Sequence, residues 1–150
     1  MKPFRDLDVP RSDATEGLAR SVMEDTLGRL EMEAPLTAHP GESALEVARR
    51  MKEAQTACAL VLEDGKLVGI FTEHDVLCKM AGAKAEAAKR PVSELMSANP
   101  ETLQETDSVA ATLNKMAMGR YRHVPIVKAD GSYSVTSIKH VLKYIAQEDW

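Results

Sequence analysis

The sequence Gly-Ile-Phe-Thr-Glu-His-Asp at residues 69–75 joins the end of a predicted strand to the beginning of a predicted helix. Before it, the pair Asp64-Gly65 separates two apolar runs of strand length, residues 56–62 and 66–71. An Asp-Gly pair between such runs favours a β-hairpin turn, in which both central residues have positive φ. Thr72 then supplies a typical helix N-cap. The helix that follows is expected to turn three apolar side chains inward, those of Val76, Leu77 and Met80.

The whole chain repeats this unit. A shift of 65 residues aligns the two halves without a gap and superposes identical or similar residues along both. The matched pairs include Leu30 with Leu95, Pro35 with Pro100, Thr37 with Thr102, Ser43 with Ser108, and Met51 with Met116. A copy of roughly 60 residues is too small to bury a comfortable core alone. The two copies are therefore expected to pack together about a pseudo-twofold axis and to leave clefts between them.

Each copy reads as strand, helix, strand, strand, helix, which predicts an α+β fold with helices over a small sheet. In the first copy the opening strand lies near residues 35–37, and a helix begins after Ser43. Its apolar face carries Ala44, Val47, Ala48 and Met51. The second copy follows the same order. Its opening strand lies near residues 100–103, and a helix after Asp107 or Ser108 carries Val109, Leu113 and Met116 inward. Strands at 123–127 and 133–136 and a helix at 138–145 complete it.

The remaining segments divide the chain into four parts. Residues 1–25 form a polar N-terminal arm outside the repeat, with a helix expected from Thr15 to Leu30. Repeat one spans residues 26–82 and repeat two spans residues 92–150. Between them, residues 83–91 form a linker that is rich in Ala, Lys and Glu and ends at a proline.

The composition is that of a globular protein with an aliphatic core: of 150 residues, 44% are apolar, 28% charged and 4% aromatic. A net charge of −4 argues against broad nucleic-acid binding, which needs a basic face. No apolar run approaches the roughly 20 residues of a membrane span, and the N-terminus lacks the apolar segment of a signal peptide. Cys58 and Cys78 fit no disulfide framework, so we expect free thiols in a cytoplasmic protein.

Three residues at the strand-to-helix junction carry groups suited to a nucleotide. Gly69 permits the close approach of a ligand or of another backbone. Thr72 lies where the N–H groups of a helix favour an anion such as phosphate. Asp75, one turn into the helix, can accept hydrogen bonds from both hydroxyls of a ribose. The same Thr-x-x-Asp spacing is also a capping box, in which the two side chains bind the helix's own N–H groups, so both interpretations stay open.

The second copy is altered at this junction. The corresponding residues are Ser134, Ser137 and His140. A helix cap survives through Ser137, but the carboxylate is lost. We therefore expect one complete site and one degenerate site.

Other chemistry has less support in the sequence. His74 and Cys78 are four residues apart on one predicted helix, but a zinc site needs two further ligands. No second close-spaced pair supplies them from Cys58, His39, His123 or His140. No Cys, His and acid trio is indicated by spacing, and neither G-x-S-x-G nor a Walker phosphate loop occurs. We therefore expect no catalytic residues and no metal site. A small metalloenzyme stays open as a third alternative for the function.

These features together resemble a tandem pair of CBS domains, the module first named from cystathionine beta-synthase. The resemblance covers about residues 28–147 and is carried by two segments, Gly-Ile-Phe-Thr-Glu-His-Asp-Val-Leu at 69–77 and Arg-His-Val-Pro-Ile-Val at 122–127. It implies two βαββα repeats packed through their sheets about a pseudo-twofold axis. It also implies adenosine-containing ligands in the clefts between the repeats, and a homodimer formed through the helices.

The resemblance also implies roles for individual residues. Asp75 would hold the ribose and Thr72 the phosphate side, while Arg122 and His123, with Arg120 nearby, would approach the phosphates. Repeat two would contribute the region from Met96 to Thr102 and the strand start at residues 121–123 to the shared cleft. The expected nucleotide-binding residues are Phe71, Thr72, His74, Asp75, Met96, Thr102, Tyr121, Arg122, His123 and Ser137.

The function implied by this resemblance is a non-catalytic regulatory module that senses an adenosine-containing small molecule. The expected ligand is AMP, ADP, ATP or S-adenosylmethionine, and no cofactor is required. A regulated enzyme or transporter would read the change that the ligand causes in the orientation of the halves. The alternative is a ligand-free module that only dimerises or docks a protein partner, which the altered second junction favours.

Overall fold

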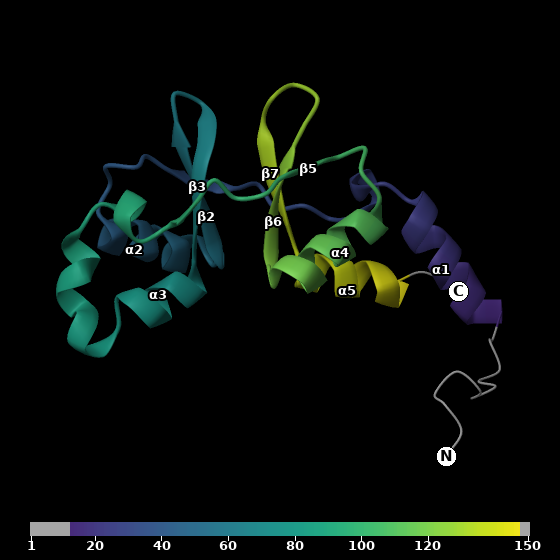
Figure 1. The fold of residues 1–150 in the computed structure, drawn as a ribbon, viewed down its shortest axis with the longest axis horizontal. Helices are drawn as coiled ribbons and strands as arrows, with labels where there is room; N and C mark the ends of the chain where they lie inside the picture. The colour runs from purple at the N-terminus through teal and green to yellow at the C-terminus, as the bar shows by residue number, and fades with distance from the viewer. Residues whose placement is uncertain (1–12, 148–150) are drawn as a thin grey trace, which may run out of the picture.

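Two β-sheets face each other at the centre of the molecule, and the helices lie on their outer sides (Figure 1). The structure is a computed structural model that describes residues 13–147. The first residues of the predicted arm and the last three residues of repeat two lie outside this range. Within it, each repeat has the predicted order of strand, helix, strand, strand, helix. The expected α+β architecture is confirmed.

The elements of repeat one are β1 (Leu36–Ala38), α2 (Ala44–Ala54), β2 (Cys58–Glu63), β3 (Lys66–Thr72) and α3 (Glu73–Lys79). Strands β1 and β2 are parallel, and β2 and β3 are antiparallel. Helix α2 begins where predicted, because the Ser43 side chain accepts a hydrogen bond from the Glu46 N–H at 3.2 Å. It ends at Gln55, which adopts a left-handed conformation with φ 53°.

Repeat two contains β5 (Leu103–Gln104), α4 (Val109–Gly119), β6 (His123–Val127), β7 (Tyr133–Ser137) and α5 (Ile138–Gln147). Strands β5 and β6 are parallel, and β6 and β7 are antiparallel, as in repeat one. The Ser108 side chain caps α4 by accepting from the Ala111 N–H at 3.1 Å. Between the repeats, η3 (Gly82–Lys89) and η4 (Val92–Glu94) are 3₁₀-helices.

The segment before repeat one differs from the prediction. The expected helix from Thr15 to Leu30 is instead α1 (Asp13–Glu24), followed by the short 3₁₀-helix η2 (Leu27–Arg29). Thr26 forms an isolated β-bridge with Ser108, and this pairing with repeat two interrupts the helix. The segment is therefore pulled out of helical conformation by contacts that are distant in the sequence.

The two repeats exchange their leading segments. Leu27 and Leu30 precede the strands of repeat one, yet they are buried in the core of repeat two. In return, Val92 and Leu95 are buried in the core of repeat one. Strand β4 (Ser97–Ala98) also crosses over and pairs with β3 at the edge of the first sheet. Each core is thus completed by chain from the other half.

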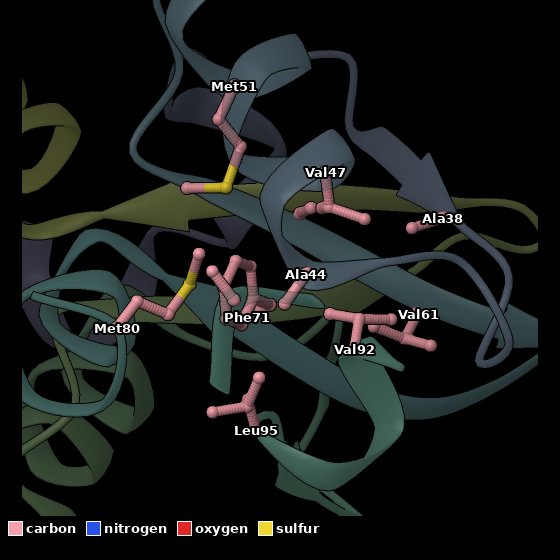
Figure 2. Close-up of a cluster of buried hydrophobic side chains, with 11 residues drawn as sticks. Ala38, Ala44, Val47, Met51, Val61, Phe71, Met80, Val92 and Leu95 are labelled. Atoms are coloured by element: carbon pink, nitrogen blue, oxygen red, sulfur yellow. The ribbon is translucent and has the colours of Figure 1, made fainter. Parts of the chain in front are cut away.

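An aliphatic core fills the space between each sheet and its helices, as the composition predicts. Figure 2 shows Val47 and Met51 of α2 and Phe71 of β3 directed into the core of repeat one. On the opposite faces, the two sheets meet through Cys58, Leu60, Ile70 and Val135. The Tyr133 hydroxyl accepts a hydrogen bond from the Leu67 N–H at 3.2 Å and so ties the two hairpins together.

The two hairpins turn differently. Asp64 and Gly65 have φ of 51° and 77°, which confirms the predicted turn with two central residues of positive φ. In the second hairpin, only Gly131 has positive φ. Asp130 instead accepts hydrogen bonds from the backbone and the side chain of Ser132, at 2.9 Å and 2.6 Å. The Asp-Gly pair of repeat two therefore forms a longer turn that is stabilised by a side chain.

The prediction that Leu77 points inward is wrong. Its side chain is 70% exposed, and Leu142, at the equivalent position of α5, is 60% exposed. Val76 and Met80 lie four residues apart and pack against the core. Leu77 is rotated from them by about 100° around the helix, so it faces away.

Candidate functional site

The beginning of α3 is closed by a reciprocal set of hydrogen bonds. The Thr72 N–H donates to Asp75 Oδ2 at 2.9 Å, and the Thr72 hydroxyl donates to the same oxygen at 3.2 Å. In return, the Asp75 N–H donates to Thr72 Oγ1 at 3.4 Å. This is the capping box that the spacing predicts as one of two interpretations.

The carboxylate of Asp75 is buried and multiply bonded. Asp75 is 5% exposed. Its second oxygen, Oδ1, lies 2.9 Å from Lys79 Nζ, and the same ammonium donates to the Leu95 carbonyl at 2.7 Å. Three of the about four lone-pair positions of the carboxylate are therefore occupied. A ribose hydroxyl would reach Oδ1 only beside Lys79 or after its withdrawal, and the side chain of Lys79 is 41% exposed.

An imidazole takes the place of the carboxylate at the beginning of α5. The Ser137 N–H donates to His140 Nδ1 at 3.1 Å, and the Ser137 hydroxyl lies 3.0 Å from the same nitrogen. Since a backbone N–H can only donate, Nδ1 is the acceptor, and the ring proton of the neutral imidazole is assigned to Nε2. That nitrogen lies 3.5 Å from Glu33 Oε1. The expected cap at Ser137 is therefore made largely by the His140 ring.

A cavity of about 420 Å³ lies beside the first strands of repeat one. Its walls come from the segment that enters β1 and from the loop between α2 and β2: Glu33, Ala34, Pro35, Leu36, Ala54, Gln55 and Thr56. The loop leads directly to Ala57, whose carbonyl accepts a hydrogen bond from the Glu73 N–H at 2.9 Å. The cavity is thus linked to the N-terminus of α3 through Thr56 and Ala57.

The sequence prediction did not include these cavity walls. In the sequence prediction, Pro35 is a proline that the two copies share at the beginning of the opening strand, and Thr56 is the beginning of an apolar run. The signal that was available is the repeated proline before the first strand of each copy, because a proline there holds the chain extended as it enters the sheet.

The predicted site residues fall into several groups. Thr72 and Asp75 are in contact. Phe71 is fully buried in the core of repeat one, so its side chain cannot touch a ligand in this arrangement. Met96 packs against the same core and covers Gly69, where an added Cβ would lie 2.1 Å from its sulfur. The close approach expected over Gly69 is made by this side chain.

The residues predicted from repeat two gather elsewhere, around the beginning of α5. The Arg122 carbonyl accepts a hydrogen bond from the Ile138 N–H at 3.0 Å, and His123 pairs with Ser137 across the hairpin. Tyr121 and Arg122 are exposed, and so is Thr102 at the entrance to β5. His74 is exposed on α3, with its Nε2 3.5 Å from Cys78 Sγ.

Burial sets the protonation of two groups at the centre of the molecule. It lowers the pKa of His123 below its ordinary value, with further lowering by His140 and Arg122, while Glu33 and Glu73 act in the opposite direction. Burial likewise raises the pKa of the Cys58 thiol to about 12, with smaller contributions from the same two carboxylates. Burial therefore favours the neutral imidazole of His123 and the neutral thiol of Cys58.

Two further observations concern the described residues as a set. Among the side chains that the structure describes, in residues 16–81 and 86–146, no three His, Cys, Asp or Glu are grouped so that they could hold a metal ion. None of the helices described in residues 13–147 is both long and apolar enough to cross a membrane.

The chain folds as a pair of βαββα units packed through their sheets. The chain matches the CBS domain family twice, over residues 27–82 and 92–147. It belongs to the CBS domain family and carries two of these domains, and CBS domain pairs are generally regulatory rather than catalytic.

Relatives and solved structures agree with this assignment. The CBS domain-containing protein CBSCBSPB1 of Arabidopsis thaliana is 31% identical over 107 residues, which is 71% of this chain and 20% of the plant protein. The chain thus spans about a fifth of the length of such plant relatives. The crystal structure of a CBS-domain containing protein from Agrobacterium tumefaciens is 30% identical, with a TM-score of 0.68 over 74% of this chain and 89% of that one.

Two more distant structures share the fold and were solved with ligands. CBSX2 in complex with AMP is 17% identical, with a TM-score of 0.71 over 83% of this chain and 99% of that one. The CBS domain pair of protein MJ0100, in complex with 5′-methylthioadenosine and S-adenosyl-L-methionine, is 23% identical, with a TM-score of 0.69 over 80% of this chain and 98% of that one.

Proposed function

We propose that this chain is a non-catalytic sensor module that binds an adenine nucleotide (AMP, ADP or ATP) or S-adenosylmethionine beside the N-terminus of α3. The observation that carries the proposal is the cavity of about 420 Å³, whose wall at Thr56 is joined to the N-terminus of α3 through Ala57 and the Glu73 N–H. Its volume is in the range of small-molecule sites. The fold neighbours crystallised with AMP and with S-adenosyl-L-methionine support this class of ligand.

The proposed contacts follow from the chemistry of the cavity and of the cap. Pro35 and Leu36 offer an apolar wall for an adenine ring. Asp75 accepts a ribose hydroxyl at Oδ1 when Lys79 swings outward into solvent. The Lys79 ammonium, released from the carboxylate, is then available to a phosphate. His74, which is exposed one turn along the same helix, adds a polar group at the rim.

Repeat two supplies a second group of phosphate-binding candidates. Arg122, His123 and Ser137 lie around the beginning of α5 and face the centre of the molecule through His123. Arg122 brings a permanent charge, and a phosphate bound there would favour protonation of His123. With His140 in place of a carboxylate, this second group lacks the residue type that is proposed to hold the ribose in repeat one.

Sensing would work through differential affinity. A ligand in this cavity, whose wall begins at Glu33 on repeat two, stabilises one relative orientation of the two halves, or of two chains, over another. A regulated enzyme or transporter would read that orientation. Both cysteines are free of disulfides, which fits a reducing compartment such as the cytoplasm.

Calorimetric titration of AMP into the wild type and an Asp75→Asn variant tests the proposal. Asparagine keeps an acceptor for the Thr72 N–H but loses the charge that faces Lys79, and hydrogen bonds to charged groups contribute more than neutral ones. We expect the variant to bind AMP about tenfold more weakly. Asp130→Asn is the matched control, because it makes the same substitution in the exposed turn of the second hairpin and should leave the affinity unchanged.

Equal affinities of the wild type and Asp75→Asn would remove the ribose role of Asp75. Absence of any heat or thermal shift with millimolar AMP, ATP and S-adenosylmethionine would remove the sensor function itself, because a ligand bound only by the native state raises its melting temperature.

The second candidate function is a ligand-free module that dimerises or docks a partner. Two observations favour it. Three of the about four acceptor positions of the Asp75 carboxylate are already occupied within the protein. Exposed apolar side chains also lie at equivalent positions of α3 and α5, Leu77 and Leu142. A homodimer through these helices is compatible with both functions. Sedimentation combined with the ligand panel separates them, since a dimer that binds none of the ligands is the second candidate.

A further inference from the structure

Helix α5 of repeat two holds the segment that leads into repeat one. Three side chains on one side of the helix reach three residues of that segment. The Tyr144 hydroxyl donates to Asp25, Lys143 pairs with Glu31, and His140 Nε2 lies 3.5 Å from Glu33 Oε1. The three contacted residues, Asp25, Glu31 and Glu33, follow one another along the segment toward the first strand of repeat one.

Glu33 is the last residue held on repeat two. Its N–H donates to the Val135 carbonyl at 3.2 Å, and the Val135 N–H donates back to the Glu33 carbonyl at 3.4 Å. The first residue held by the sheet of repeat one is Leu36, which pairs with Ala59. The chain between these two anchors, together with Glu33 and Leu36 themselves, forms one wall of the cavity. A shift of Glu33 therefore moves that wall directly.

The cap residues of the two repeats make different second contacts. In repeat one, the free oxygen of Asp75 turns to Lys79 of its own helix. In repeat two, the free nitrogen of His140 turns away from its helix to Glu33. Because Nδ1 accepts the Ser137 N–H, the nitrogen that faces Glu33 carries the proton. The alteration from Asp to His thus replaces a contact within one helix by a contact between the repeats.

We propose that His140 is a positioning residue for the repeat-one cavity: it fixes Glu33 on repeat two, so that the state of α5 sets ligand affinity in the other repeat. The ligand part of this inference rests on the proposed nucleotide function, whereas the link between His140 and Glu33 does not. A change at α5, where Leu142 and Ile138 are exposed, would reach the cavity through one side-chain contact.

Two single variants and their combination isolate the contact. His140→Asp restores the residue type that caps α3, so it keeps an acceptor for the Ser137 N–H while replacing the ring N–H that faces Glu33 by a carboxylate. Glu33→Gln removes the charge of the half-exposed partner without touching the cap. In the double variant, the glutamine amide can donate to the new aspartate, which re-forms the contact with its polarity reversed. Glu101→Gln is the matched control, because it removes a surface ion pair with Lys115 elsewhere on repeat two.

The first measurement is backbone hydrogen exchange at residue 33, whose amide is bonded to Val135. We expect His140→Asp to accelerate this exchange about fivefold, and the double variant to restore it toward the wild-type rate. The second measurement is AMP affinity by calorimetry, which should fall and recover in the same order. Glu101→Gln should change neither quantity. A purely structural role for His140 would lower the melting temperature of both His140→Asp proteins alike, without recovery in the double variant.

The inference is overturned if the amide of residue 33 exchanges in His140→Asp at the wild-type rate. It is also overturned if adding Glu33→Gln to His140→Asp does not slow this exchange again. A wild type that does not bind AMP would overturn the proposed function and the ligand part of the inference, while exchange at residue 33 would still decide the link. If the exchange rates change as expected but His140→Asp binds AMP as tightly as the wild type, only the ligand part of the inference is overturned.

Discussion

Two threonines in the core of repeat two have hydroxyl groups that find no partner within the described part of the chain. Thr112 of α4 and Thr136 of β7 are both fully buried, and the side-chain oxygen of each makes no hydrogen bond. The equivalent residues of repeat one are Val47 and Phe71, which fill its core with apolar atoms. An unpaired buried hydroxyl costs about 1–3 kcal/mol. The two hydroxyls therefore make the second core less stable than apolar side chains at the same positions would.

Replacement of Thr112 by valine should stabilise the protein. Valine has nearly the same shape and is equally β-branched, so the change removes a desolvated hydroxyl without opening a cavity. We expect the free energy of unfolding in urea to rise by about 1 kcal/mol. Thr106→Val, at an exposed position, should leave it within about 0.5 kcal/mol. A lower unfolding free energy for Thr112→Val would mean that the hydroxyl is satisfied in solution.

The buried thiol of Cys58 makes stability depend on alkaline pH. Its pKa is raised from 9.0 to about 12, so the folded state holds the neutral thiol where the unfolded chain ionises. The contribution is fully present below pH 9.0 and is lost as the pH rises toward 12. We expect Cys58→Ala to lose less unfolding free energy than the wild type between these limits. Cys78→Ala, which alters the exposed thiol, should follow the wild-type curve.

Local features of the elements could be predicted, and non-local ones could not. The hairpin at Asp64-Gly65, the caps at Ser43 and Ser108, and the capping box of Thr72 all depend on residues within a few positions of one another. Half of the candidate site, the Thr72–Asp75 cap, was predictable for this reason. The other half, the wall that begins at Glu33, depends on where a distant segment packs.

The exchange of leading segments had no signal in the apolar pattern. Leu30 and Leu95 occupy matched positions, and a buried leucine looks the same whichever core it enters. The same holds for α1, which was predicted to continue to Leu30 but gives way where Thr26 pairs with Ser108. Tertiary contacts override helix propensity at such points.

Leu27→Ala tests the exchange of segments. Leu27 is fully buried among the side chains of repeat two, although it precedes repeat one. Its truncation should lower the free energy of unfolding by about 2–5 kcal/mol, and amide exchange should quicken first in α4 and β6 of repeat two. Leu142→Ala is the control, because this side chain is largely exposed and should cost little. Faster exchange confined to repeat one would contradict the observed packing.

At the scale of the whole molecule, the two repeats form one folding unit. Their sheets share the interface around Leu60 and Val135, and each core contains leucines from the other half's leading segment. Division of the chain at the predicted boundary would leave Leu27 and Leu30 without a core, and would remove Val92 and Leu95 from repeat one. Neither half would then bury enough apolar surface to fold by itself.

Fragments 1–82 and 83–150 should each be unfolded alone. We expect circular dichroism of either fragment to lack a cooperative thermal transition, and an equimolar mixture to regain one. The intact chain should unfold in a single transition that coincides for far-UV and tyrosine signals. A cooperative transition in an isolated fragment would show that a repeat is self-sufficient.

The crossed leading segments also bear on how such a chain could arise. A polypeptide with a single copy would carry an apolar leading segment that its own core does not accommodate. Two such polypeptides could form a domain-swapped dimer in which each core buries the leading segment of the other. When the copies are joined through η3, the exchange of leading segments becomes intramolecular. It then depends on the effective concentration set by the length of the linker and not on the protein concentration. In one chain the two copies need not be identical, and they differ at His140, which matches Asp75, and at Thr136, which matches Phe71.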